Sequence, residues 1–112
     1  AAARSGLVGY AAGGPSRSKR PGEAEVTTLY VLRTAQGYGL GRRLLCDIAR
    51  VFAANEATSL MLSVLRDNIP ARGFYEHLGG QAEAPRREPG PGGVTYEVSY
   101  RWPDIRVLTK TA

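Results

Sequence analysis

The sequence predicts one α/β domain over residues 1–112, with helices layered on a central sheet (an α+β layered arrangement). Three observations predict this class. Segments rich in β-branched and aromatic residues alternate with segments whose apolar residues recur at helical spacing. Glycine and proline clusters stand between the segments as turn signals. A length of 112 residues allows a single hydrophobic core, so we expect no second domain.

The first half of the chain predicts two strands and a helix. Leu7–Ala12 is expected as a strand that ends at Gly13-Gly14-Pro15, and the polar stretch 16–22 as a hairpin loop. Glu25–Leu32 is rich in β-branched and aromatic residues, which favours a second strand. After a glycine-rich turn at 36–41, a helix is predicted from Leu40 to Asn55. Its apolar residues share one face: Leu44, Leu45, Ile48 and Phe52.

The second half repeats the alternation. Ser59–Leu65 is mostly apolar, which is typical of a strand covered on both faces. Asp67 and Asn68 precede Pro70 in the order of an N-cap and first helical turn, and Gly79-Gly80 suits the C-cap of the same helix. A loop at 85–93 is expected between two short strands, the second at Val94–Trp102. The sequence gives no prediction after Pro103.

Charge and composition narrow the class of function. The net charge is +5 and the pI about 9.8, but the basic residues form short groups without interleaved aromatics, so nucleic-acid binding is not expected. No apolar stretch is long enough to span a bilayer. Cys46 and His77 are the sole Cys and His, so neither a disulfide nor a metal site is expected. We expect a cytoplasmic protein. The start, AAARSGLVGY, lacks a methionine, so we expect a fragment or processed product of a longer protein. The alternatives are a short natural N-terminus or a fold that a partner subunit completes.

The segment Leu29–Leu45, LYVLRTAQGYGLGRRLL, is the most informative. Its three turn glycines, Gly37, Gly39 and Gly41, let successive backbone N–H groups point into one concavity at a helix N-terminus, which suits a pyrophosphate. A Walker A loop is excluded because Arg42-Arg43 stands where Lys-Ser/Thr is needed. A dinucleotide fingerprint also fits poorly, since it lacks its third glycine. The alternative is a glycine turn with no ligand.

This segment resembles the acetyl-CoA signature of the GNAT superfamily, Gln/Arg-x-x-Gly-x-Gly/Ala, through Gln36, Gly39 and Gly41. A second block, Asn68–Gly80, is similar to the family's Asn-x-x-Ala-x-x-Phe-Tyr-x-x-x-Gly segment. The resemblance covers about residues 7–102. It implies a mixed, mostly antiparallel central sheet with helices on its faces, here N-terminally truncated: the family's first strand and helix pair are missing from the chain.

The resemblance also implies acetyl-CoA as cosubstrate and no metal. Backbone groups of three strand residues would meet the pantetheine: Leu29, Tyr30 and Val31. The turn would hold the pyrophosphate with seven residues: Gln36, Gly37, Tyr38, Gly39, Leu40, Gly41 and Arg42. Asn68 would contact the coenzyme from the other side. Tyr75 matches the family's general acid, although a packed helix tyrosine is the alternative. Glu25 has the spacing of a general base, Glu23 being a weaker choice, and a solvated strand glutamate is the alternative.

The function implied is an N-acetyltransferase that acylates a primary amine, small molecule or peptide, through a tetrahedral intermediate, with a homodimer as the expected assembly. Arg33-Thr34-Ala35 departs from the family, which usually has a proline and an acidic residue there. This departure and the missing N-terminal elements keep a second hypothesis open: a catalytically silent module that binds CoA or dimerises. The acceptor amine is not specified by the sequence; the basic composition mildly disfavours a polycationic one.

Overall fold

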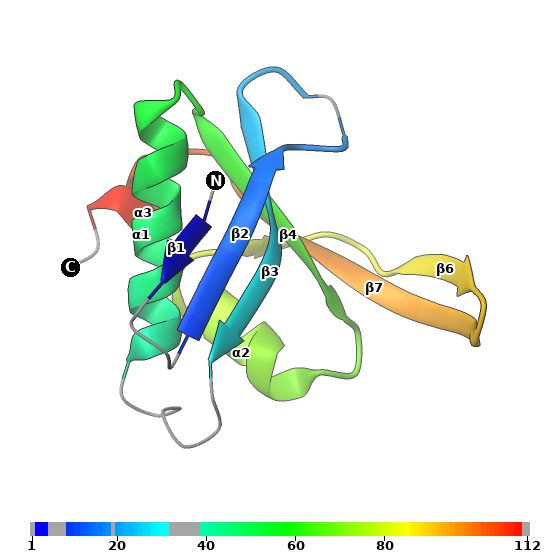
Figure 1. Ribbon diagram of the computed structural model, residues 1–112. Helices are drawn as coiled ribbons and strands as arrows, with labels where there is room; N and C mark the ends of the chain where they lie inside the picture. The colour runs from blue at the N-terminus through cyan, green and yellow to red at the C-terminus, as the bar shows by residue number, and fades with distance from the viewer. Residues whose placement is uncertain (1, 5–8, 19, 32–38, 111–112) are drawn as a thin grey trace.

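A computed structural model describes residues 2–4, 9–18, 20–31 and 39–110 (Figure 1). Its helices are α1 (Leu40–Ala54), α2 (Ile69–His77) and α3 (Arg106–Thr109). Its strands are β1 (Ala2–Arg4), β2 (Gly9–Pro15), β3 (Glu23–Val31), β4 (Ser59–Leu65), β5 (Gln81–Ala82), β6 (Arg86–Gly90) and β7 (Gly93–Trp102). They form one sheet in the order β1-β2-β3-β4-β7-β5, with β6 paired to β7.

The predicted class is confirmed: helices lie against a sheet in which only β3 and β4 run parallel among the pairs of described strands. The strand Ser59–Leu65 has the predicted bounds, and α1 differs from its prediction by one residue, because Asn55 is its C-cap. The polar stretch 16–22 connects the antiparallel strands β2 and β3, as expected of a hairpin loop.

Two predictions about the strands are wrong. The first strand does not end at Gly13-Gly14-Pro15, because those residues continue β2 by pairing with Val26, Glu25 and Ala24 of β3. The expected loop at 85–93 contains β6, which forms a hairpin with β7 from Arg86↔Glu97 to Gly90↔Gly93. Figure 1 shows this hairpin reaching out from the body of the molecule. The prediction for Leu7, Val8 and Leu32 lies outside the described residues.

The core lies between α1 and one face of the sheet. The apolar face predicted for α1 is confirmed, since four side chains are buried: Leu44, Leu45, Ile48 and Phe52. From β7, the buried side chains of Val98, Tyr100 and Trp102 join the same cluster. Tyr75 and Leu78 of α2 pack against it, so both helices cover the same face. None of the described helices has the length and apolar character that a membrane span requires.

Strands β3 and β4 diverge after a short parallel ladder. The ladder has three residue pairs and ends at Glu25↔Met61. The β2–β3 register then shifts, because Ala12 pairs with Thr28 whereas Gly13 pairs with Val26, which leaves Thr27 as an extra residue in β3. Such a bulge bends its strand and increases its twist. Meanwhile β4 stays paired with β7 as far as Leu65↔Glu97, so a gap opens between β3 and β4.

Candidate functional site

An open pocket of about 630 Å³ lies where β3 and β4 diverge. It combines side chains from both strands, the N-terminus of α1 and the first turns of α2. Seven of the residues singled out in the sequence line it together: Leu29, Gly39, Leu40, Gly41, Arg42, Asn68 and Tyr75. Tyr30 and Val31 continue β3 beyond Leu29. Gln36, Gly37 and Tyr38 fall outside the described residues.

The N-terminus of α1 is built to receive an anion. Gly39 is the N-cap residue and has a φ of 75°, a left-handed conformation that favours glycine. No acidic residue stands in the first turn, which instead carries Arg42 and Arg43. The first backbone N–H groups of a helix have no acceptor within it, and the helix dipole adds positive potential there. These groups face the pocket together with the Arg42 side chain, so this end can bind a phosphate.

The helices α1 and α2 approach closely at this pocket. A Cβ atom added to Gly41 would lie 3.4 Å from Cζ of Phe74, an ordinary van der Waals distance, so the first turn of α1 lies beside the Phe74 ring of α2. Phe74 is itself a pocket residue. The N-terminal end of α1 therefore lies close to the part of α2 that carries Phe74 and Tyr75.

Asn68 has a structural task at the pocket rim. It is the N-cap residue of α2, as predicted, and its Oδ1 accepts a hydrogen bond from the Ala71 N–H at 3.3 Å. Because a capping asparagine uses its oxygen in this way, its amide Nδ2 is the atom that can donate to a ligand. The same side chain can thus begin the helix and contact a coenzyme.

Tyr75 lies between aromatic rings. Its ring centroid is 5.4 Å from that of Phe74, 5.8 Å from that of Tyr100 and 6.3 Å from that of Trp102, the last in an edge arrangement. Burial raises the pKa of the Tyr75 phenol, which stays protonated at neutral pH. Tyr75 thus packs against other rings, as the alternative interpretation of the sequence expected, and it also lines the pocket.

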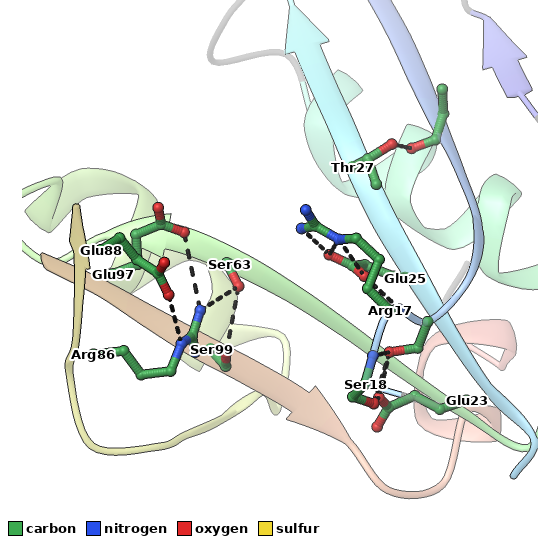
Figure 2. A network of polar contacts seen from close by, with 12 residues as sticks. Arg17, Ser18, Glu23, Glu25, Thr27, Ser63, Arg86, Glu88, Glu97 and Ser99 are labelled. Carbon is green, nitrogen blue, oxygen red and sulfur yellow. Dashed lines mark hydrogen bonds and ion pairs between the residues drawn. The ribbon is translucent and has the colours of Figure 1, made fainter. Parts of the chain in front are cut away.

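A second hollow, of about 430 Å³, lies over a different set of residues, on the sheet face opposite the core. It is lined by polar side chains of the β2–β3 loop and of the strands: Arg17, Ser18, Glu25, Ser63, Glu83, Arg86, Glu88, Glu97, Ser99 and Arg101, together with Met61. We call it the polar cleft. Figure 2 shows its two main groups, Arg17 on Glu25 and Arg86 beside Ser63 and Ser99.

Glu25 lies in this cleft at the last pair of the β3–β4 ladder. Its side chain is only 3% exposed, and Arg17 covers it with Nη2 at 2.6 Å from Oε2. The Arg17 backbone N–H also donates to Oε1 at 3.0 Å. The Arg17 guanidinium is the main cause of a lowered pKa of Glu25, which is ionised at neutral pH. The carboxylate is thus paired with a cation, unlike the solvated strand glutamate weighed as the alternative.

Glu23, the weaker choice for a base, is held in a separate network. Ser16 donates to its Oε1 at 2.6 Å, and Ser18 and Arg101 also hydrogen-bond to the carboxylate. Although burial, the largest influence, raises the pKa of Glu23, these hydrogen bonds together lower it. Arg101 also contacts Glu83 at 3.0 Å. This arrangement ties the β2–β3 loop to β7 and gives Glu23 a structural role.

Sequence reasoning missed most of the polar cleft. Arg86 donates to Ser99 and Ser63 and contacts Glu88 at 3.2 Å, yet it stands in a segment predicted as a loop. In the sequence, Arg17 is only a member of one of the short basic groups, with no indication that it pairs with Glu25. The usable signal was the alternation in β3, where Glu23 and Glu25 point away from the core and Ala24 and Val26 into it.

Cys46 is buried in α1: it is 1% exposed, and burial raises the pKa of its thiol. No group of three His, Cys, Asp or Glu side chains in the described ranges is arranged to hold a metal ion.

Known proteins are similar to this chain in sequence and in fold. A model described as the Acetyltransferase (GNAT) family matches residues 1–80. YuaI of Bacillus subtilis strain 168, described as an uncharacterized N-acetyltransferase, is 30% identical over 103 residues, which cover 91% of this chain and 59% of YuaI. A GNAT-family acetyltransferase candidate from Desulfovibrio desulfuricans is 27% identical, with a TM-score of 0.73 over 88% of this chain and 61% of its own.

Two further solved structures of acetyltransferases have a similar fold. The ribosomal-protein-S18-alanine N-acetyltransferase of Escherichia coli has a TM-score of 0.70 at 25% identity, covering 91% of this chain and 65% of its own. A Bacillus subtilis acetyltransferase in complex with CoA has a TM-score of 0.71 at 18% identity, covering 89% and 72%, and shows the fold alone. The chain spans about three fifths of the length of YuaI and of the Desulfovibrio protein.

Proposed function

The chain belongs to the GNAT family of acetyltransferases, and from that premise we propose that it transfers an acetyl group from acetyl-CoA to a primary amine. One observation carries the proposal: the pocket at the β3–β4 divergence joins the N-terminus of α1 to a half-buried tyrosine whose phenol is protonated at neutral pH. The helix N-terminus suits a pyrophosphate, and the tyrosine suits a leaving thiolate that needs a proton.

The coenzyme would lie along the gap between the strands. Beyond Glu25, no described strand pairs with the edge of β3 that faces β4, so the backbone N–H and C=O groups of the segment 29–31 that point to this edge are available to pantetheine amides, while the others face β2. The first turn of α1, with Arg42, would bind the pyrophosphate. Gln36, Gly37 and Tyr38 complete the turn in this proposal on the strength of their sequence motif alone.

The acceptor would approach from the polar cleft. An alkylammonium group must lose a proton before its nitrogen can attack a thioester carbon. Glu25, ionised and at the start of the strand divergence, would accept that proton, directly or through water. A backbone N–H near Val31 would stabilise the oxyanion of the tetrahedral intermediate.

Collapse of that intermediate breaks the carbon–sulfur bond and needs a proton for the thiolate. Tyr75, whose pKa is raised by burial, would donate it from the pocket wall. The resulting phenolate is unfavourable in an apolar site, so the phenol would recover a proton at once from the acylated ammonium or from water. The balance of the whole step is acetyl-CoA plus alkylammonium giving amide, free CoA thiol and one proton.

The test is amine-dependent release of free thiol, followed with a thiol reagent across a panel of alkylamines, amino acids and short peptides. We expect release with at least one amine, and its loss in Tyr75→Phe. Coenzyme binding without release for any amine would instead indicate the catalytically silent module.

Assembly and location remain predictions. A homodimer is implied by the sequence resemblance, and a cytoplasmic location is expected from a sequence whose single cysteine cannot form an internal disulfide. Exposed apolar side chains of β4 and the β6–β7 hairpin, namely Leu65, Val94 and Tyr96, offer a surface for self-association. Light scattering of the purified chain would measure the assembly directly, and a monomer at all accessible concentrations would contradict the dimer.

A further inference from the structure

Three arginines line the polar cleft, and they are held very differently. Arg101 is 14% exposed and bonds to both Glu23 and Glu83. Arg86 is 42% exposed and is held by Ser63, Ser99 and Glu88. Arg17 is 79% exposed and, of these three, relies on the fewest side chains, because the hydrogen bonds of its guanidinium all go to Glu25. Among the three, Arg17 is therefore the cation that can leave most easily.

Glu25, the partner of Arg17, is buried and fixed in place. Glu25 is 3% exposed and fixed in β3 by ladders on both sides, with Ala24 and Glu25 paired to β2 and β4. A buried carboxylate needs a cation or hydrogen-bond donors, since burial of an unpaired charge is unfavourable. The pair thus joins a fixed, buried anion to a cation whose side chain is largely exposed to solvent.

We propose that the Arg17 guanidinium holds the place of the acceptor's ammonium group, so that a cationic amine binds by displacing Arg17 from Glu25. The inference rests on the proposed function, since it names the class of acceptor and a residue that controls its access. Arg17 is a specificity-determining residue here, not a catalytic one.

The remaining charge of the cleft favours such an acceptor. When Arg17 leaves, the lining keeps four carboxylates, Glu25, Glu83, Glu88 and Glu97, against two guanidinium groups. The backbone N–H of Arg17 can continue to donate to Oε1 of Glu25. A cationic amine would therefore enter a cleft with an excess of negative charge, although the chain as a whole carries +5. In this proposal the local charge of the cleft outweighs the basic composition of the chain, from which a polycationic acceptor was mildly disfavoured.

Displacement makes Arg17 a competitor of the substrate. A binding site that is closed nine-tenths of the time has an apparent affinity about tenfold weaker than its intrinsic affinity. Removing the Arg17 side chain should therefore strengthen amine binding, whereas removal of a cation that helped to hold the substrate would weaken it. The direction of this change separates the two roles.

The experiment is an NMR titration of the full chain with butylamine, 1,4-diaminobutane and, as the uncharged match, butanol. The Nε–H signal of Arg17 reports whether the guanidinium is on Glu25. We expect either amine to shift that signal toward a free guanidinium and butanol to leave it unchanged. Arg17→Ala should bind the amines about tenfold more tightly, and Glu25→Gln should lose saturable binding.

Two controls keep the result interpretable. Arg106 is another exposed arginine that is paired with a carboxylate, Asp104, but it lies outside the cleft. Arg106→Ala should therefore bind the amines as the unaltered chain does. Arg17→Gln keeps a neutral donor for Glu25 if Arg17→Ala fails to fold, and it too should bind the amines more tightly. Melting followed by circular dichroism verifies the fold of each variant.

The outcomes separate this inference from acetyl transfer itself. Tighter amine binding in the Arg17 variants supports the inference even if no thiol is released, in which case acetyl transfer is the claim that fails. Amine binding that leaves the Arg17 signal unchanged overturns the inference, even in a chain that transfers acetyl groups. Unchanged or weaker affinity in folded Arg17→Ala and Arg17→Gln overturns it as well, and so does their failure to bind either amine.

Discussion

Gly13 of β2 lies directly against the backbone of Glu25 in β3: a Cβ atom added to Gly13 would lie 2.0 Å from the Glu25 carbonyl oxygen and 3.0 Å from Cζ of Phe52. The contact occurs at the register shift between Ala12 and Gly13. The absence of a side chain at this position allows β2 to approach β3 closely next to the bulge, just beyond which β3 no longer pairs with β4.

Gly13→Ala should therefore destabilise the fold. We expect a loss of about 2 kcal/mol in the free energy of unfolding, as in other overpacked sites, measured by urea denaturation. Gly14→Ala is the matched control, because a Cβ there meets nothing within 4 Å, and its effect should stay within about 0.5 kcal/mol. Equal stability of the two variants would show that the close approach at Gly13 is unimportant.

Tyr75→Phe should separate chemistry from binding. The substitution keeps the ring that packs against Tyr100 and Trp102 and removes only the hydroxyl. We expect kcat to fall by about 10²-fold, the usual scale for loss of a general acid, with little change in the Kd of acetyl-CoA or in Tm. Tyr96→Phe on the exposed hairpin is the control. An unchanged kcat in Tyr75→Phe would leave the tyrosine a packing role only.

The raised pKa of Tyr75 also bears on the pH profile. Because burial moves the phenol's titration above its ordinary value of 10, the acid stays protonated through the alkaline range in which enzymes are assayed. We therefore expect that loss of the Tyr75 proton causes no decline in kcat below about pH 9. Below that pH, any alkaline decline of kcat in the unaltered chain should persist in Tyr75→Phe. A decline near pH 7 that disappears in this variant would mean that the phenol is far more acidic than its burial implies.

Asn68 allows its two tasks to be tested separately. Asn68→Ser keeps an oxygen that can cap α2 but has no amide donor, whereas Asn68→Ala loses both. We expect Asn68→Ala to lose about 1 kcal/mol of stability and Asn68→Ser only a few tenths. Both should weaken acetyl-CoA binding to a similar degree, measured by calorimetry. If affinity follows stability instead, the residue acts only through the helix that it caps.

Glu23 and Glu25 should make stability depend on pH in the acid range. Both have pKa values lowered from 4.5 in the folded chain, so the unfolded chain binds more protons near that pH. Their contribution is therefore complete above about pH 5 and is lost as the pH falls through the folded pKa values. Urea denaturation from pH 7 to pH 3 should show a shallower decline in Glu23→Gln than in the unaltered chain. A decline of equal slope would mean that the network around Glu23 has no net effect.

The alternation of strands and helices was predictable because hydrophobic periodicity is a local property. It located α1, β4 and α2, together with the Asn68 cap, to within a residue or two. The end of β2 was not predictable, because the Gly-Gly-Pro turn signal is overridden by pairing of the same residues with β3. Likewise β6 exists because β7 lies beside it, and Pro89 and Gly90 give no local sign of a strand.

The pocket and the polar cleft differ in the same way. The pocket is built from two contiguous motifs, so the sequence named most of the described residues that line it. The cleft brings together the β2–β3 loop, strands β3 and β4 and the β6–β7 hairpin through ion pairs and hydrogen bonds between side chains. Neither the pairing of Arg17 with Glu25 nor that of Arg86 with Ser99 follows a spacing that could be recognised in the sequence.

The most direct test of the central claim is calorimetric titration of acetyl-CoA into the chain and into Gly39→Glu and Gly39→Gln. Both variants place a side chain of the same size at the left-handed N-cap of α1, but only glutamate adds negative charge beside the helix N-terminus. We predict binding near the micromolar range (about −8 kcal/mol) by the unaltered chain. Gly39→Glu should bind at least about tenfold more weakly than Gly39→Gln, a difference of about 1.4 kcal/mol. A folded chain that does not bind acetyl-CoA, or two variants that bind it equally well, would contradict a pyrophosphate site at this end of α1.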